Sequence, residues 1–68
     1  MTYVISDTAQ GFWQKTNAKT LTGAKIACTR EFGAGYNSAT LYVGEMDENG
    51  QVEFIVRKDN FPGSKWTD

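Results

Sequence analysis

The sequence predicts a small α+β domain: a single antiparallel sheet of four to five short strands with one α-helix packed on one face, in the order β-β-α-β-β-β. Three features support this class. Hydrophobic residues alternate near the amino end, they follow helical spacing between residues 20 and 32, and two strand-like segments flank a turn at Asn49-Gly50. The chain has 68 residues, of which 40% are hydrophobic, so we expect a single domain over residues 1–68 with one core.

The first strand is expected at residues 2–7, where Tyr3 and Ile5 share one side. Residues 7–11 are typical of a turn. Residues 12–16 are then expected to return antiparallel as a short second strand, with one of their two aromatic side chains toward the core.

The clearest helix signal lies at residues 20–32. Thr20 is a typical N-cap, and the glycines within residues 33–35 are typical of a helix end. A spacing of 3, 4 and 4 residues places four apolar side chains on one face, which we expect to pack on the sheet. These side chains are Leu21, Ala24, Cys28 and Phe32.

The strongest local signal is a hairpin at residues 39–58. Its turn contains Asn49 and Gly50, a pair that suits a tight turn requiring positive φ. A Pro-Gly loop follows the hairpin, and residues 65–68 are long enough only for a short last strand that holds Trp66.

Alternation along the hairpin assigns its side chains to the two faces of the sheet. The other face of the sheet is expected to be open and to carry some of Ile55, Tyr42 and one side chain of the first strand. The side chains expected to face the helix are Leu41, Val43, Val52, Phe54 and Val56.

Composition excludes several kinds of site. Cys28 is the single cysteine and there is no histidine, which excludes an internal disulfide, a Cys/His zinc site and a histidine-based catalytic pair. Asp47 and Glu48 fit the chemistry of the turn, and Glu45 and Glu53 are expected to face each other across the hairpin. We therefore expect no catalytic residues, no metal, no cofactor and no enzymatic activity. The absence of a long apolar segment and the lone cysteine favour a cytoplasmic protein.

The outer face of the predicted helix is the candidate binding surface. At about 100° per residue, Ile26 and Arg30 lie opposite the apolar face, with Gly23 beside them and Lys25 on the flank. An exposed isoleucine beside an arginine suits contact with a partner. The alternatives are that Ile26 is an isolated surface residue or is covered by residues 33–38.

Basic residues near the carboxyl end extend this candidate surface. Arg57 and Lys58 end the fourth strand and Lys65 precedes the last strand, so the three could form one patch. The alternative is a solvated strand end. A second possibility is a small nucleic-acid-binding module that uses the open sheet face and Lys15 together with these cations. The formal net charge of −1 argues against binding nucleic acid through bulk charge.

Four short segments also suggest a family: "YVIS", "TLTGAKIACTREF", "ATLYVGEMDENGQV" and the closing "KWTD". They resemble a group of small phage-encoded proteins that includes a type I-F anti-CRISPR inhibitor. In that inhibitor the helix bears two basic residues after an alanine, which contact the protein backbone of the RNA-guided surveillance complex and occlude the path of target DNA. Lys25 matches the first basic position after Ala24, and Ile26 stands at the second. The resemblance implies a non-enzymatic phage or mobile-element protein that binds and inhibits a host defence complex.

Overall fold

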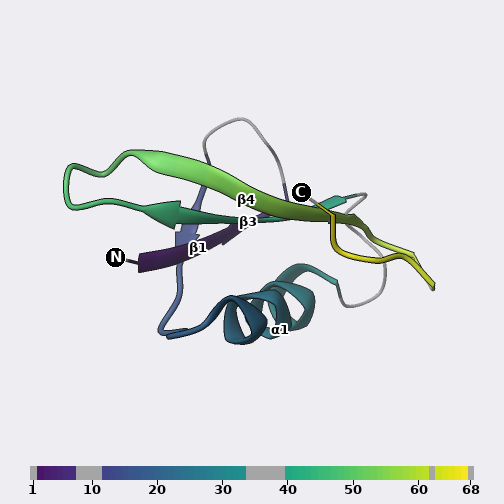
Figure 1. The fold of residues 1–68 in the computed structure, drawn as a ribbon. Coiled ribbons are helices and arrows are strands. Elements are labelled where there is room, and N and C mark those ends of the chain that lie inside the picture. Colours follow the sequence, from purple (N-terminus) through teal and green to yellow (C-terminus); the bar gives the residue numbers. More distant parts are fainter. Residues whose placement is uncertain (1, 8–11, 34–39, 62, 68) are drawn as a thin grey trace.

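The computed structural model describes residues 2–7, 12–33, 40–61 and 63–67. It contains a four-stranded antiparallel sheet with the strand order β2-β1-β3-β4 and one helix, α1, that crosses one face of the sheet (Figure 1). The predicted α+β class is therefore confirmed. The elements are β1 (Thr2–Ser6), β2 (Gln14–Lys15), α1 (Leu21–Phe32), β3 (Thr40–Met46) and β4 (Val52–Asp59).

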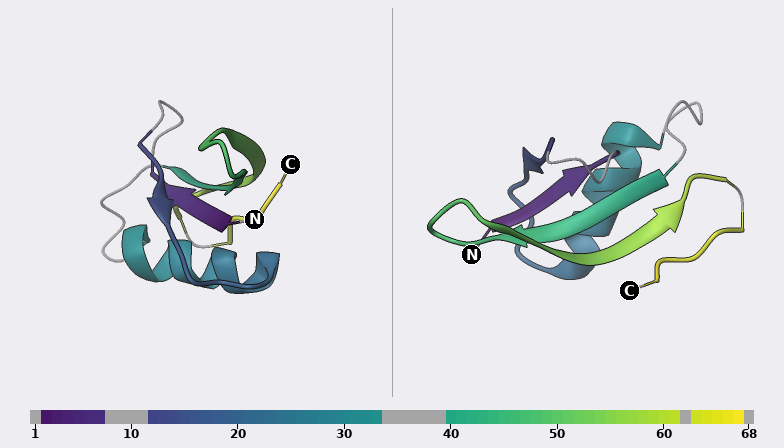
Figure 2. Two further views of the ribbon diagram at one scale, coloured as in Figure 1. Left: turned by 90° about the vertical axis from the view of Figure 1, so that its left-hand side faces the viewer. Right: turned by 90° about the horizontal axis from the view of Figure 1, so that it is seen from above.

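The helix lies on one side of the sheet only, against β1 and β3, as the views at right angles show (Figure 2). The last described segment runs beside the outer edge of β4. The strand predicted at residues 65–68 is reduced to a single bridge, in which Arg57 and Thr67 exchange backbone hydrogen bonds of 2.7 and 2.8 Å. Residue 68 lies outside the described residues.

Tyr3 and Ile5 share the helix side of β1 as predicted, because Ile5 is buried in the core and Tyr3 packs against it. Val4, on the other side, is also fully buried. β2 is only two residues long. Neither aromatic side chain of residues 12–16 joins the core: Phe12 is 75% exposed, and Trp13 is half-buried outside the core cluster. The predicted turn falls largely on residues 8–11, outside the described residues.

The helix begins and ends where the sequence indicates. Oγ1 of Thr20 accepts a hydrogen bond of 3.0 Å from the N–H of Gly23, which makes Thr20 the N-cap. At the other end the N–H of Gly33 donates to the carbonyl of Thr29 at 2.8 Å; residues 34 and 35 lie outside the described residues. The predicted apolar face is confirmed by the burial of Ala24 and Cys28 and the packing of Leu21 and Phe32 on the core.

β3 and β4 form the predicted hairpin, and Asp47 closes its turn. Oδ1 of Asp47 accepts hydrogen bonds of 2.9 Å from the N–H groups of Asn49 and Gln51. Gly50 has a φ of 82°, in the left-handed region that favours glycine. The expected first residue of the hairpin, 39, lies outside the described residues.

The pairing of β3 with β4 shifts at a β-bulge. Val43 pairs with Val56, whereas the next residue, Gly44, pairs with Phe54, so Ile55 is the extra residue. Ile55 and Val56 both turn toward the helix, where Val56 is buried and Ile55 packs against the core. The predicted alternation is therefore wrong here: Phe54 lies on the helix-free face and is 46% exposed.

A glycine permits the close approach of the two strands at this point. A Cβ on Gly44 would lie 2.8 Å from the carbonyl oxygen of Glu53 and 3.0 Å from Cγ1 of Val52. Any side chain there would force the strands apart. Val52, predicted to face the helix, pairs with Met46 and shares the helix-free face with Phe54.

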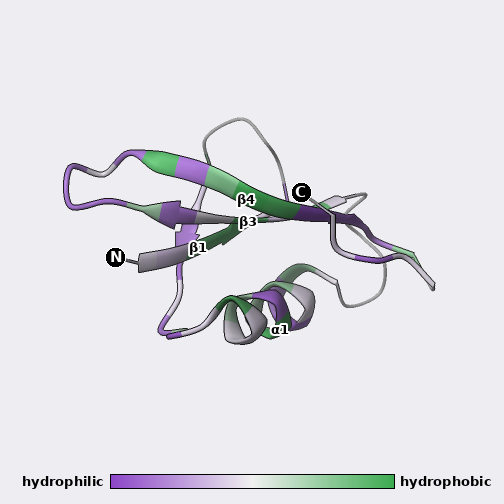
Figure 3. Ribbon diagram, viewed as in Figure 1, coloured by the Kyte–Doolittle hydropathy of each residue, from purple (hydrophilic) through white to green (hydrophobic). Residues whose placement is uncertain are grey.

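The core lies between α1 and the middle of the sheet. Figure 3 shows hydrophobic residues along β1 and β4, and hydrophilic residues at the hairpin turn and at the end of β4. Because the inner face of α1 supplies all of its buried side chains, the outer face is left for other contacts. The buried hydrophobic cluster consists of Ile5, Ala24, Cys28, Leu41, Val43 and Val56.

Candidate functional site

The outer face of α1 carries an exposed isoleucine. Ile26 is 54% exposed, although isoleucine is among the residue types most often buried. Arg30, one turn further along, is exposed, and Lys25 is half-buried. The predicted positions of these residues relative to the apolar face therefore hold. Most of the segment that would cover Ile26 in the alternative view, residues 33–38, lies outside the described residues.

These side chains border a shallow hollow of about 460 Å³. Its lining is formed by Lys25, Ile26, Thr29, Arg30 and Trp66, which we call the α1–Trp66 surface. The hydroxyl of Thr29 donates to the carbonyl of Lys25 at 3.0 Å, so its hydrogen is already used within the helix. The hollow thus combines the apolar side chains of Ile26 and Trp66 with two cations, and no carboxylate of the described residues lines it.

The pairing of Thr67 with β4 directs Trp66 to this surface. Thr67 pairs with Arg57 on β4, and adjacent residues of an extended segment point to opposite sides, so Trp66 turns toward the helix. There it packs against the core, and Nζ of Lys58 lies 5.9 Å from its ring centroid, within the range of a cation–π contact. Sequence reasoning placed Trp66 in a last strand and missed its part in this surface.

The three cations predicted near the carboxyl end border a neighbouring hollow of about 290 Å³, so the structure brings Arg57, Lys58 and Lys65 together. They do not share one face of the sheet, however. Lys58 pairs with Leu41 on the helix side, whereas Arg57 pairs with Tyr42 on the helix-free side. Arg57 and Lys58 therefore reach this hollow from opposite faces of the sheet, and Asp59 lines it with them.

Two further predicted residues lie apart from the α1–Trp66 surface. Gly23 lines neither hollow; a Cβ there would lie 3.3 Å from Oγ1 of Thr20 and 3.5 Å from Cβ of Ala18, so this glycine packs against the segment before the helix. Lys15, on β2, shares the helix-free face with Arg57, because paired residues of a sheet point to the same side.

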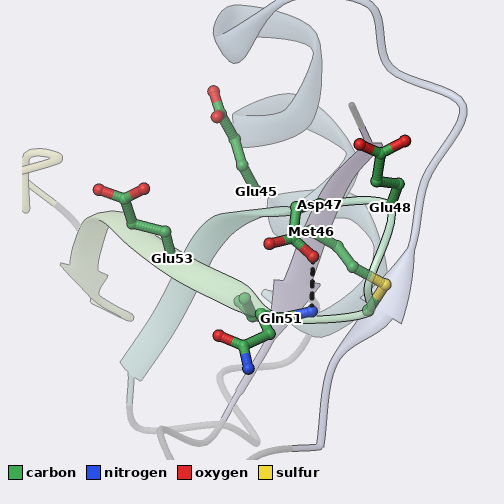
Figure 4. Close-up of a pocket in the computed structure, with 7 residues that line it drawn as sticks. Glu45, Met46, Asp47, Glu48, Gln51 and Glu53 are labelled. Carbon is green, nitrogen blue, oxygen red and sulfur yellow. Dashed lines mark hydrogen bonds between the residues drawn. The ribbon is translucent and has the colours of Figure 1, made fainter.

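The hairpin turn borders a third hollow, of about 500 Å³, which is mostly acidic (Figure 4). Glu45 and Glu53 pair across β3 and β4, as predicted, and Oδ1 of Asp47 accepts a hydrogen bond from the N–H of Gln51. Figure 4 shows the carboxylates of Glu45, Glu48 and Glu53 spread around the hollow instead of converging. Among the described residues, no group of three or more His, Cys, Asp or Glu side chains is arranged to hold a metal ion.

Cys28 is fully buried beneath the sheet. Its Sγ lies 3.5 Å from the carbonyl oxygen of Tyr42 and 3.8 Å from that of Ser6, within reach of weak hydrogen bonds. Burial raises the pKa of Cys28 to about 11, because desolvation disfavours the thiolate. The thiol therefore stays protonated near neutral pH and acts as a small core residue.

Fold and surfaces together define a small α+β domain with an outward-facing helix surface and an acidic hairpin turn. No family model matches this chain, and comparisons with curated proteins and with solved structures find no match. Within the described ranges, no helix has the length and apolar character required to cross a membrane. The function must therefore be inferred from the surfaces of the molecule itself.

Proposed function

We propose that this chain is a non-enzymatic binding protein whose α1–Trp66 surface docks on a larger protein or nucleoprotein complex. Following the resemblance of the helix and hairpin segments to a type I-F anti-CRISPR inhibitor, the proposed partner is a host defence complex in the cytoplasm of the host. Lys25 stands at the first basic position of that inhibitor's helix, and Ile26 replaces the second with an apolar contact.

The observation that supports docking is that the exposed side chain of Ile26 lies in the same hollow as other residue types common at interfaces. Single exposed apolar side chains are common and need no explanation. Here Ile26 shares a hollow with Trp66 and Arg30. Tryptophan and arginine are enriched among the residues that dominate binding energy at protein interfaces, where an apolar centre is bordered by polar groups.

The charges indicate an acidic partner surface. Lys25 and Arg30 border the hollow, and Lys58 lies over the ring of Trp66. Among the described residues, nothing forms a hydrogen bond or an ion pair with the guanidinium of Arg30. A protein segment that presents an apolar side chain between carboxylates would satisfy both the apolar hollow and its cations.

The proposal is tested in a bacterium with an active type I-F CRISPR system, infected by a phage that this system targets. Expression of the chain should restore plaque formation, and Ile26→Asp should abolish the effect. Thr22→Asp is the matched control, because Thr22 is exposed on the same helix, lies outside the hollow and undergoes the same change of charge. Loss of a central apolar anchor costs about 2 kcal/mol, roughly 30-fold in affinity.

Two outcomes would contradict the proposal. If the wild-type chain leaves plaque formation unchanged, the proposed defence complex is not its partner. If Ile26→Asp and Thr22→Asp inhibit as well as the wild type, inhibition does not use the α1–Trp66 surface.

A further inference from the structure

The face of the sheet opposite α1 carries its own group of aromatic and basic side chains. Paired residues of neighbouring strands point to the same side, so the register places Tyr42 beside Arg57 and Phe54 beside Gly44 on this face. Lys15 reaches the same face from β2. We call Tyr42, Phe54, Arg57 and Lys15 the sheet-face cluster.

The two aromatic rings of this cluster form an edge-to-face pair. The ring centroids of Tyr42 and Phe54 lie 6.4 Å apart, with an angle of 66° between the ring planes. The bulge at Ile55 creates the pair by turning Phe54 away from the core. Phe54 is 46% exposed, and its neighbour Gly44 has no side chain to cover it. The pair therefore offers a supported, exposed ring on which a flat group can stack.

Cations lie on both sides of these rings. Arg57 pairs directly with Tyr42. Lys15 lies three strands away from Phe54, about 14 Å at the usual spacing of strands. Both basic side chains are exposed. Between them, Val4 and Ser6 of β1 are fully buried on this face, and Oγ of Ser6 donates to the carbonyl of Phe12 at 2.7 Å. A bound chain of negative groups would therefore pass over the segment at Phe12 to contact both cations.

Glu45 and Glu53 of the hairpin are directed away from this cluster, whereas Asp59 is not. Glu45 pairs with Glu53 and with Tyr3, whose side chain packs on the core, so both carboxylates belong to the helix side. Asp59, which pairs with Thr40 at the end of β4, is a carboxylate on the helix-free side. Two cations and one nearby carboxylate therefore lie on this face, on a chain with a net charge of −1.

We propose that the sheet-face cluster is a second binding site, which takes single-stranded nucleic acid. Unpaired bases stack on the rings of Tyr42 and Phe54, and the phosphates contact Arg57 and Lys15. A sheet that stacks unpaired bases on aromatic residues is an established mode of recognition for single strands. In a duplex both faces of each base are covered by its neighbours, so the same contacts are denied to double-stranded nucleic acid.

This site is physically separate from the α1–Trp66 surface, because the two lie on opposite sides of the sheet. Figure 2 shows that α1 covers only one of those sides. Substitutions in one surface should therefore leave binding at the other unchanged, and either proposal can fail without the other.

The test is a fluorescence-polarisation titration of the full chain with labelled oligo-dT and oligo-U of about 12 nucleotides, and with a duplex of equal length. We expect the single strands to bind more tightly than the duplex and to weaken as salt is raised. Phe54→Leu and Arg57→Gln should each lower the affinity roughly fivefold or more. Lys25→Gln removes a positive charge from the helix side and should leave the affinity unchanged.

Three results would overturn the proposal: no binding of either single strand at low salt, an equal loss for Lys25→Gln and Arg57→Gln, or unchanged affinity for Phe54→Leu. An NMR titration of the wild-type chain with oligo-dT gives an answer that depends on no variant. Amide shifts centred on Tyr42 and Phe54 support the site, whereas shifts centred on α1 contradict it. A further outcome is that the wild-type chain binds no oligonucleotide but captures a protein that Arg57→Gln does not capture. That outcome would assign this face to a protein partner and reject the nucleic-acid site.

Discussion

Ile26 and Cys28 lie two residues apart on α1, and their environments are opposite. Ile26 is 54% exposed, whereas Cys28 is fully buried against the sheet. Two positions correspond to about 200° around a helix, so these two apolar side chains point to opposite sides. One is exposed to water and the other is buried in the core. Substitutions at these positions should therefore affect different properties, binding in one case and stability in the other.

Ile26→Asp should leave the free energy of unfolding within about 0.5 kcal/mol of the wild-type value, because the side chain is already in water. Ala24→Asp should unfold the chain, because it places an unpaired carboxylate in the core, where Ala24 is fully buried. Thermal melts followed by circular dichroism compare the two variants. A large drop for Ile26→Asp would show that Ile26 belongs to the core.

Cys28 should make stability fall at alkaline pH. Burial raises its pKa from 9.0 to about 11, so the folded state binds the thiol proton more tightly than the unfolded state. The resulting stabilisation is complete below about pH 9 and is lost as the pH rises to about 11, on the order of 2 kcal/mol in total. Urea titrations over this range compare the wild type with Cys28→Ala. Equal losses in the two proteins would exclude the thiol as the cause.

At the scale of the element, the bulge in β4 decides which side chains face the helix. Gly44→Ala should lower the free energy of unfolding by about 1–3 kcal/mol, because its Cβ would lie 2.8 Å from the carbonyl oxygen of Glu53. Gly23→Ala is the matched control, since its Cβ would lie 3.3 Å from Oγ1 of Thr20 and the helix favours alanine. Urea unfolding should show no such loss for the control. Equal midpoints for both variants would mean that the strands separate without cost.

Local signals were sufficient to predict α1 and the hairpin, because capping by Thr20 and the turn at Gly50 depend on nearby residues alone. The bulge was not predictable from alternation, since Phe54, Ile55 and Val56 form a continuous apolar run that gives no period of two. Only the register with β3 shows which of them leaves the core.

The candidate site was predicted only in part, because some of its residues follow from local patterns and others depend on strand pairing. Helical geometry alone places Ile26 and Arg30 on the outer face. The contribution of Trp66 depends on a bridge between Thr67 and Arg57, ten residues apart in the chain, which no local pattern indicates. The division of Arg57 and Lys58 between two faces likewise follows from their pairing with β3.

At the scale of the whole molecule, Trp66 joins the last segment to the sheet and to α1. Trp66→Ala should lower the free energy of unfolding by about 2 kcal/mol, since the half-buried ring packs on the core. It should also speed hydrogen exchange at the amide of Arg57, which donates to the carbonyl of Thr67 at 2.7 Å. Phe61→Ala is the control, because Phe61 is 57% exposed. Unchanged exchange at Arg57 would show that the bridge holds without the tryptophan.

The molecule presents two surfaces of different chemistry on opposite sides of one sheet. The helix side offers an apolar hollow with cations, and the helix-free side offers an edge-to-face pair of rings with cations. Four of the eight acidic residues, Glu45, Asp47, Glu48 and Glu53, border the hollow at the hairpin turn. A chain with a net charge of −1 can therefore still carry local groups of cations elsewhere.

Quantitative affinity capture tests most directly whether the α1–Trp66 surface binds a protein partner. Lysate from a bacterium with an active type I-F CRISPR system is passed over the wild-type chain, Ile26→Asp and Thr22→Asp, and the retained proteins are quantified by mass spectrometry. We expect subunits of the defence complex to be retained by the wild type and by Thr22→Asp, and depleted at least tenfold with Ile26→Asp. Equal recovery with all three baits, or no enrichment of the complex with the wild type, would show that the α1–Trp66 surface does not bind this complex.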